Sequence, residues 1–155
     1  MRLNFFTPPR VPARLPADLE LEIEKLQRCE TKDEVLAVAY DLLTQKYRGY
    51  RLKTFTRLFD LFDVDVHNLW AKNGFLHCTN MNYLMKILLL GSQKFGEEDI
   101  RFRWTLIQFY SPHEYLRVRT NNDECIDVDV WGKAYGIKLG SYAHGSHSGS
   151  MRAIN

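Results

Sequence analysis

The sequence predicts an α+β fold in which helices come first along the chain and pack on an antiparallel sheet formed by the second half. Apolar residues recur at helical spacing as far as Gly91, and residues 100–131 are instead rich in aromatic and β-branched residues. The chain has 155 residues, of which 45% are hydrophobic and 13% aromatic. This length and composition suit one domain with a real core.

The charge balance selects no class of partner. The formal net charge is +2 and 26% of residues are charged, so no nucleic-acid partner is expected. No apolar run approaches the ~20 residues of a membrane span, and the N-terminus lacks the apolar core of a secretory signal. We therefore expect no membrane partner and a cytoplasmic location.

Cysteine usage excludes two further classes. Cys29, Cys78 and Cys125 are odd in number and include no C-x-x-C spacing, which argues against a disulfide framework and a structural zinc site. His144 and His147 lie in a glycine- and serine-rich stretch and are not interpreted as a metal site. We expect neither a metal nor another cofactor.

Composition divides the chain into three parts. Residues 1–16 form a proline-rich arm, residues 17–143 a single domain, and residues 144–155 a flexible Gly/Ser-rich tail.

Four helices are predicted in the first half. The first begins after Pro16, and Thr31 with Glu34 forms a capping box that begins the second. A third follows the apolar spacing of Leu52 to Phe62. The fourth begins at Cys78, after the Asn73-Gly74 turn, and ends at Gly91 as its C-cap.

Three strands are predicted after residue 99. The first covers 100–110, a break falls at Ser111-Pro112, and the second covers 113–119. A turn at 121–123 leads to the third strand, 124–131.

Cys78 is the first candidate for chemistry. A thiol in the first turn of a helix lies near free backbone N–H groups and the positive end of the helix dipole, which stabilise a thiolate. A small buried core residue is the alternative reading of an unpaired cysteine.

Strand pairing selects the partner of His113. Matching apolar faces puts Leu116 opposite Ile126 and therefore His113 opposite Asp129. In this register Asp127 lies across from Tyr115 and is the alternative carboxylate. Cys78, His113 and Asp129 would then be the nucleophile, base and orienting group of a catalytic triad.

An oxyanion would be held by the Cys78 backbone N–H, with Trp70 or Asn73 as candidates for the second donor.

These residues also resemble a known family. The run Gly74 to Cys78, the helix to Gly91, the strand that opens with His113 and the strand Cys125 to Asp129 are similar to the core of the transglutaminase-like superfamily, which has a papain-like arrangement of cysteine, histidine and aspartate. The resemblance covers residues 70–131. The chain departs from the family at Leu76, Cys125 and Val130, where members commonly have glycine, tryptophan and proline.

The resemblance implies acyl transfer on amide bonds through a thioester, with a peptide or protein amide as substrate. Hydrolysis is favoured over cross-linking, because a small domain offers little to exclude water from the thioester. One alternative is a catalytically inactive peptide-binding module of the same fold. Another is an RNA-associated protein that uses the arginines among the strand aromatics, namely Arg101, Arg103, Arg117 and Arg119.

Overall fold

The structure is a computed structural model that describes residues 9–146. Its helices and strands, in chain order, are α1 (Ala17–Gln27), α2 (Lys32–Lys46), β1 (Tyr47–Arg48), α3 (Arg51–Thr56), η2 (Leu58–Phe62), α4 (Val66–Ala71), β2 (Gly74–Phe75), α5 (Cys78–Gly91), η3 (Glu97–Asp99), β3 (Ile100–Ile107), β4 (Ser111–Arg119), β5 (Cys125–Val128) and η4 (Trp131–Tyr135).

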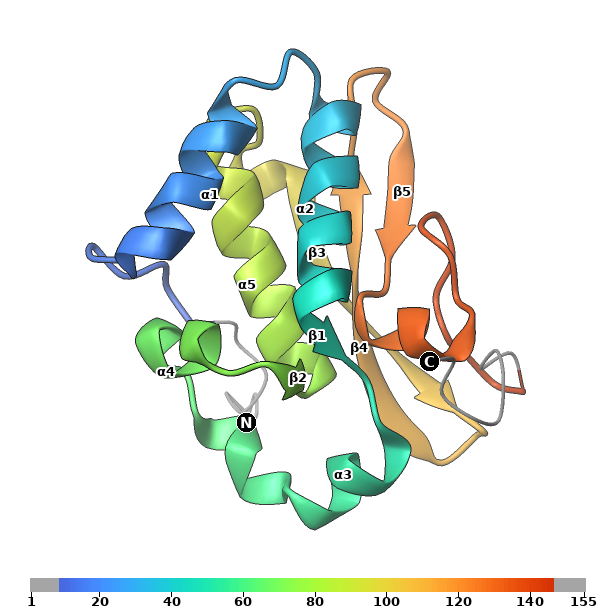
Figure 1. Cartoon of the computed structure of the whole chain (residues 1–155). Coiled ribbons are helices and arrows are strands. Elements are labelled where there is room, and N and C mark those ends of the chain that lie inside the picture. The colour runs from blue at the N-terminus through green and yellow to red at the C-terminus, as the bar shows by residue number, and fades with distance from the viewer. Residues whose placement is uncertain (1–8, 147–155) are drawn as a thin grey trace, which may run out of the picture.

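The described chain is a mixed α+β fold, which confirms the predicted class. β3, β4 and β5 form an antiparallel sheet in that order, and β1 pairs with β2 in a short parallel ladder. α5 lies between α1 and α2 on one side and β4 on the other (Figure 1). The helix that begins at Cys78 is therefore the central helix.

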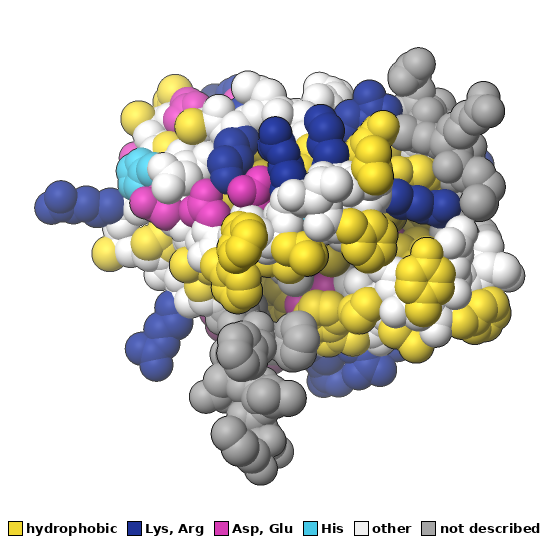
Figure 2. Space-filling view, turned by 90° about the horizontal axis from the view of Figure 1, so that it is seen from below, with side chains coloured by type: hydrophobic (Ala, Val, Ile, Leu, Met, Phe, Trp, Pro, Cys, Tyr) yellow, Lys and Arg dark blue, Asp and Glu magenta, His cyan; other side chains and the backbone are white. Residues whose placement is uncertain are grey.

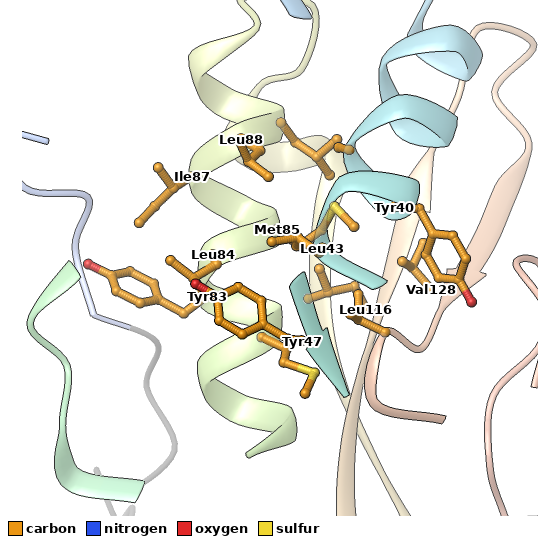
Figure 3. Packing of buried hydrophobic residues seen from close by; sticks show 14 of the residues in the cluster. Tyr40, Leu43, Tyr47, Tyr83, Leu84, Met85, Ile87, Leu88, Leu116 and Val128 are labelled. Atoms are coloured by element: carbon orange, nitrogen blue, oxygen red, sulfur yellow. The ribbon is translucent and has the colours of Figure 1, made fainter. Parts of the chain in front are cut away.

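The core is centred on α5. Leu84, Met85 and Leu88 are fully buried, and they pack with Leu43 of α2 and Leu116 of β4 (Figure 3). Each such side chain contributes about 1.5–3 kcal/mol relative to an exposed one. This packing fixes α5 against the sheet and so fixes the position of its first turn.

Local signals place the helix ends well. Thr31 Oγ1 accepts a hydrogen bond from the Glu34 N–H over 3.1 Å at the start of α2, as the capping box predicts.

Gly91, however, is not a C-cap. It is the last residue of α5, Ser92 caps the helix, and a Cβ at Gly91 would lie 2.9 Å from Ile23 of α1. Glycine is needed there for close packing of the two helices.

The third predicted helix is shorter than expected and breaks into α3 and the 3₁₀ helix η2. Its apolar residues do not enter the core: Leu52 is 65% exposed, Phe59 88% and Phe62 68%. Periodicity identified the helical spacing, but within residues 9–146 these three side chains remain on the surface.

The break between β3 and β4 falls earlier than predicted. The turn consists of Gln108–Tyr110, with positive φ at Gln108 and Phe109, and β4 already includes Ser111 and Pro112. His113 is consequently paired with Thr105 within the ladder and does not begin its strand.

The predicted register of β4 and β5 is wrong by two residues. Leu116 pairs with Val128, not with Ile126, and Asp127 pairs with Arg117, not with Tyr115. The turn at residues 121–123 decides this, because the Thr120 N–H bonds to the Glu124 carbonyl over 2.8 Å and so sets these two residues opposite one another. A shift of two residues leaves every side chain on its predicted face.

The start of the predicted tail contacts the sheet. The Gly145 N–H donates to the Leu106 carbonyl of β3 over 2.7 Å, and Ala143, the last residue of the predicted domain, is fully buried. Residues 147–155, like the first eight residues of the arm, lie outside the described part. Within residues 9–146 no helix has the length and apolar character needed to span a membrane.

Candidate active site

Cys78 is the first residue of α5 and is half-buried. The preceding residue, His77, is the N-cap, and its side chain makes no capping hydrogen bond. The first backbone N–H groups of the helix therefore keep no side-chain cap, and the positive end of the helix dipole faces the region of the thiol. The start of a helix in this state favours a negative charge beside it.

The structure brings His113 and Asp129 into direct contact. His113 Nε2 lies 2.8 Å from Asp129 Oδ2, and the two residues are 2% and 1% exposed. Cys78 lies near enough to the His113 ring to help raise its pKa. The structure thus brings the three residues singled out in the sequence into one neighbourhood, with a direct bond between His113 and Asp129.

These contacts decide the protonation of His113. Burial lowers its pKa, but the charge of Asp129, the hydrogen bond to it and the contact with Cys78 outweigh burial and raise the pKa to about 10. The ring is therefore an imidazolium at neutral pH, placed between a carboxylate and a thiol.

Backbone groups hold the Asp129 carboxylate in place. Oδ1 accepts from the Gly132 N–H over 2.8 Å, and Oδ2 accepts from the Ala143 N–H over 2.9 Å. A Cβ at Gly132 would lie 2.6 Å from Oδ2, so only glycine permits this approach. The chain after β5 thereby orients the carboxylate toward His113.

Trp131 covers the other side of the His113 ring. The ring centroids are 5.3 Å apart, and Trp131 stacks on Tyr135 at 5.1 Å. Gly49 packs so closely on the indole that a Cβ would overlap it. η4 therefore places an aromatic ring against the imidazole, at an interplanar angle of 56°.

Asp127, the alternative carboxylate, has a different partner. Arg117 Nε and its terminal nitrogen bond to the two Asp127 oxygens over 2.8 and 3.1 Å. Because this fork occupies both oxygens, Asp129 is the carboxylate at His113.

The two candidates for a second oxyanion donor make other contacts. Trp70 is buried with its ring edge-on to Tyr47, and Lys46 Nζ lies 5.1 Å from the Trp70 ring centroid. Asn73 Oδ1 accepts from Lys46 Nζ over 3.1 Å. These contacts tie both residues to the β1–β2 region and add no support for an oxyanion role.

Sequence reasoning missed two side chains that flank Cys78. His77 Nε2 donates to the Arg57 carbonyl over 2.7 Å, and Asn80 Nδ2 donates to the Asp63 carbonyl over 2.8 Å. Burial lowers the pKa of His77, which favours the neutral ring. These bonds fasten the segment between α3 and α4 beside Cys78. The polar residues next to Cys78 were the available sequence signal.

An apolar surface surrounds this end of the molecule. Phe55 of α3, Tyr110 of the β3–β4 turn and Trp131 line one small cavity. Figure 2 looks onto this end and shows hydrophobic side chains gathered around a hollow. Cys78 and His113 are not among the residues that line this small cavity.

Comparisons with protein-family models, curated proteins and solved structures find no match to this chain. Among residues 9–146 no group of three or more histidine, cysteine, aspartate or glutamate side chains is arranged to hold a metal ion.

Proposed function

We propose that this chain is a cysteine-dependent enzyme that transfers acyl groups from amide bonds through a thioester intermediate. The observation that carries the proposal is the almost fully buried His113–Asp129 pair, which lies near Cys78 at the start of α5. A buried imidazolium beside a half-buried thiol at a helix start is suited to nucleophilic catalysis.

The first half-reaction uses the ion pair. The Cys78 thiolate attacks the amide carbonyl carbon and forms a C–S bond, while the carbonyl oxygen becomes an oxyanion beside the free N–H groups of the α5 start. His113 then gives its proton to the leaving nitrogen as the C–N bond breaks. Asp129 keeps the ring oriented and compensates its charge.

The second half-reaction restores the enzyme. His113, now neutral, removes a proton from water, and the resulting hydroxide attacks the thioester carbonyl. The C–S bond breaks, the acid leaves and the thiolate–imidazolium pair returns. Hydrolysis is favoured over transfer to an amine because Cys78 is only half-buried, which leaves water access to the thioester. A transglutaminase-like peptidase or amidase fits these steps.

A generic acyl donor tests this proposal without knowledge of the substrate. p-Nitrophenyl acetate should give a burst of p-nitrophenol equal to the enzyme concentration, and intact mass spectrometry should find one acetyl group on Cys78 that hydroxylamine removes. The Cys78→Ala variant should show neither. If the wild-type protein acetylates Cys125 as readily as Cys78, the proposal is wrong and an inactive peptide-binding module is the better account.

A further inference from the structure

A second concave surface lies beside η4. It is a groove of about 730 Å³ between the end of α2 with β1 and β2 on one wall and the segment from η4 to residue 138 on the other. Figure 1 shows η4 beside β1, in agreement with their direct contacts. The volume lies in the range of ordinary ligand sites.

All charged side chains that line the groove within the described chain are basic. Four basic residues line it, and no aspartate or glutamate is among its lining residues within the described chain. The basic residues are Lys46, Arg48, Lys133 and Lys138. For a protein with a formal net charge of +2, this is a local concentration of positive charge.

Contacts with rings and an amide position two of these lysines without neutralising them. Lys46 Nζ bonds to Asn73 Oδ1 over 3.1 Å and lies 5.5 Å from the Tyr47 ring centroid, while Lys133 Nζ lies 6.0 Å from the Tyr40 ring centroid. A carboxylate partner would cancel the charge, whereas a ring face or an amide oxygen holds the ammonium and leaves its charge available. Between residues 9 and 146, the three lysines of the groove form no ion pair; they are Lys46, Lys133 and Lys138.

We propose that this groove binds a peptide segment that carries several aspartate or glutamate side chains. The lysines come from both walls, which suits carboxylates spaced along an extended segment. Phosphate sites are commonly built on helix N-termini, and here the α2 residues in the wall belong to the C-terminal end of that helix. Lys46 compensates the negative end of α2, but Lys133 and Lys138 lie outside that helix and have no such role.

Binding in the groove does not depend on the proposed catalysis, although the walls of the groove adjoin the candidate active site. Asn73 and Gly74 precede Cys78 by a few residues, and Trp131 of η4 contacts His113. Binding is therefore measured directly and needs no turnover.

Fluorescence anisotropy with two labelled dodecapeptides tests the assignment, one with six glutamates and one with glutamines at the same positions. The glutamate peptide should bind at least about tenfold more tightly, with an affinity that falls as salt rises. The Lys133→Gln/Lys138→Gln variant should lose about tenfold or more. Its matched control, Arg101→Gln/Arg103→Gln, removes the same charge from exposed positions on β3 and should lose less than about twofold.

Two outcomes overturn the proposal. Equal losses in both variants would show that binding follows net charge and not the groove. If inorganic tripolyphosphate or a single-stranded RNA binds in a Lys133- and Lys138-dependent way while the glutamate peptide does not, the groove recognises phosphates and the peptide assignment is wrong.

Discussion

His113 Nε2 donates to Asp129 Oδ2 over 2.8 Å in a site where both side chains are almost fully buried. An ion pair in such surroundings is costly to break, because removal of one charge leaves the other buried without compensation. Several predictions concern this pair and the residues that hold it.

Asp129→Asn should lower the free energy of unfolding at pH 7 by about 3–5 kcal/mol, the usual cost of leaving one partner of a buried pair alone. Asp127→Asn is the matched control, because it breaks the partly exposed Arg117 pair and should cost only about 0–1 kcal/mol. Urea unfolding measures both. Similar losses in the two variants would contradict the assignment of Asp129.

The same pair predicts a pH dependence of stability. The pKa of His113 is raised to about 10 in the folded protein, from about 6.5 when unfolded. The folded state thus binds the extra proton, so its stabilisation is complete below about pH 6.5 and is lost as pH rises toward 10. The unfolding free energy should fall between pH 7 and 9.5, and in Asp129→Asn this slope should flatten.

Glu114 should add a separate dependence at lower pH. It is 4% exposed, and burial raises its pKa to about 7 despite its hydrogen bond from Asn82 and the nearby charge of His113. A raised carboxyl pKa means that stability falls as pH rises from about 4.5 to 7. Glu114→Gln should therefore raise the melting temperature at pH 8 relative to wild type and leave it nearly unchanged at pH 4.5. A lower melting temperature at pH 8 would show that the carboxylate is needed in its ionised form.

Gly132→Ala should disturb the site through Asp129. The added methyl group would lie 2.6 Å from Oδ2 and push the carboxylate away from His113. We expect the rate of Cys78 alkylation at pH 5.5 to fall about tenfold. Gly140→Ala is the control, since its φ of +94° makes alanine strained but nothing lies within 4 Å of the new Cβ. Equal alkylation rates in the two variants would contradict the role of Gly132.

Much of the site could be predicted from local signals. The Asn73-Gly74 turn and the apolar spacing after Cys78 were sufficient to place this residue at a helix start, as found in α5. The alternation of the strands put His113 and Asp129 on one face, as found, but the predicted register that set them directly opposite one another is wrong by two residues. The absolute register did not follow, because the geometry of the 121–123 turn outweighed the apolar matching.

Tertiary relations were beyond the sequence. The spacing of Leu52 to Phe62 was helical, yet no pattern could show that Phe59 and Phe62 would remain exposed. The bond from His77 to the Arg57 carbonyl and the ring contact of Trp131 with His113 join segments that are distant in the chain. The groove between η4 and β1 likewise exists only in the folded chain.

The measurement that tests the central claim most directly is the pH profile of iodoacetamide alkylation, with each modified cysteine identified by mass spectrometry. A free thiol with a pKa of about 8.5 is only about 0.1% thiolate at pH 5.5. Cys78 should nonetheless react at that pH at least about tenfold faster than the exposed Cys125, while the buried Cys29, whose pKa burial raises, stays slow. In His113→Ala the reaction of Cys78 at pH 5.5 should disappear and its rate should rise with pH like that of an ordinary thiol. An unchanged Cys78 profile in His113→Ala would contradict the ion pair and the acyl-transfer function built on it.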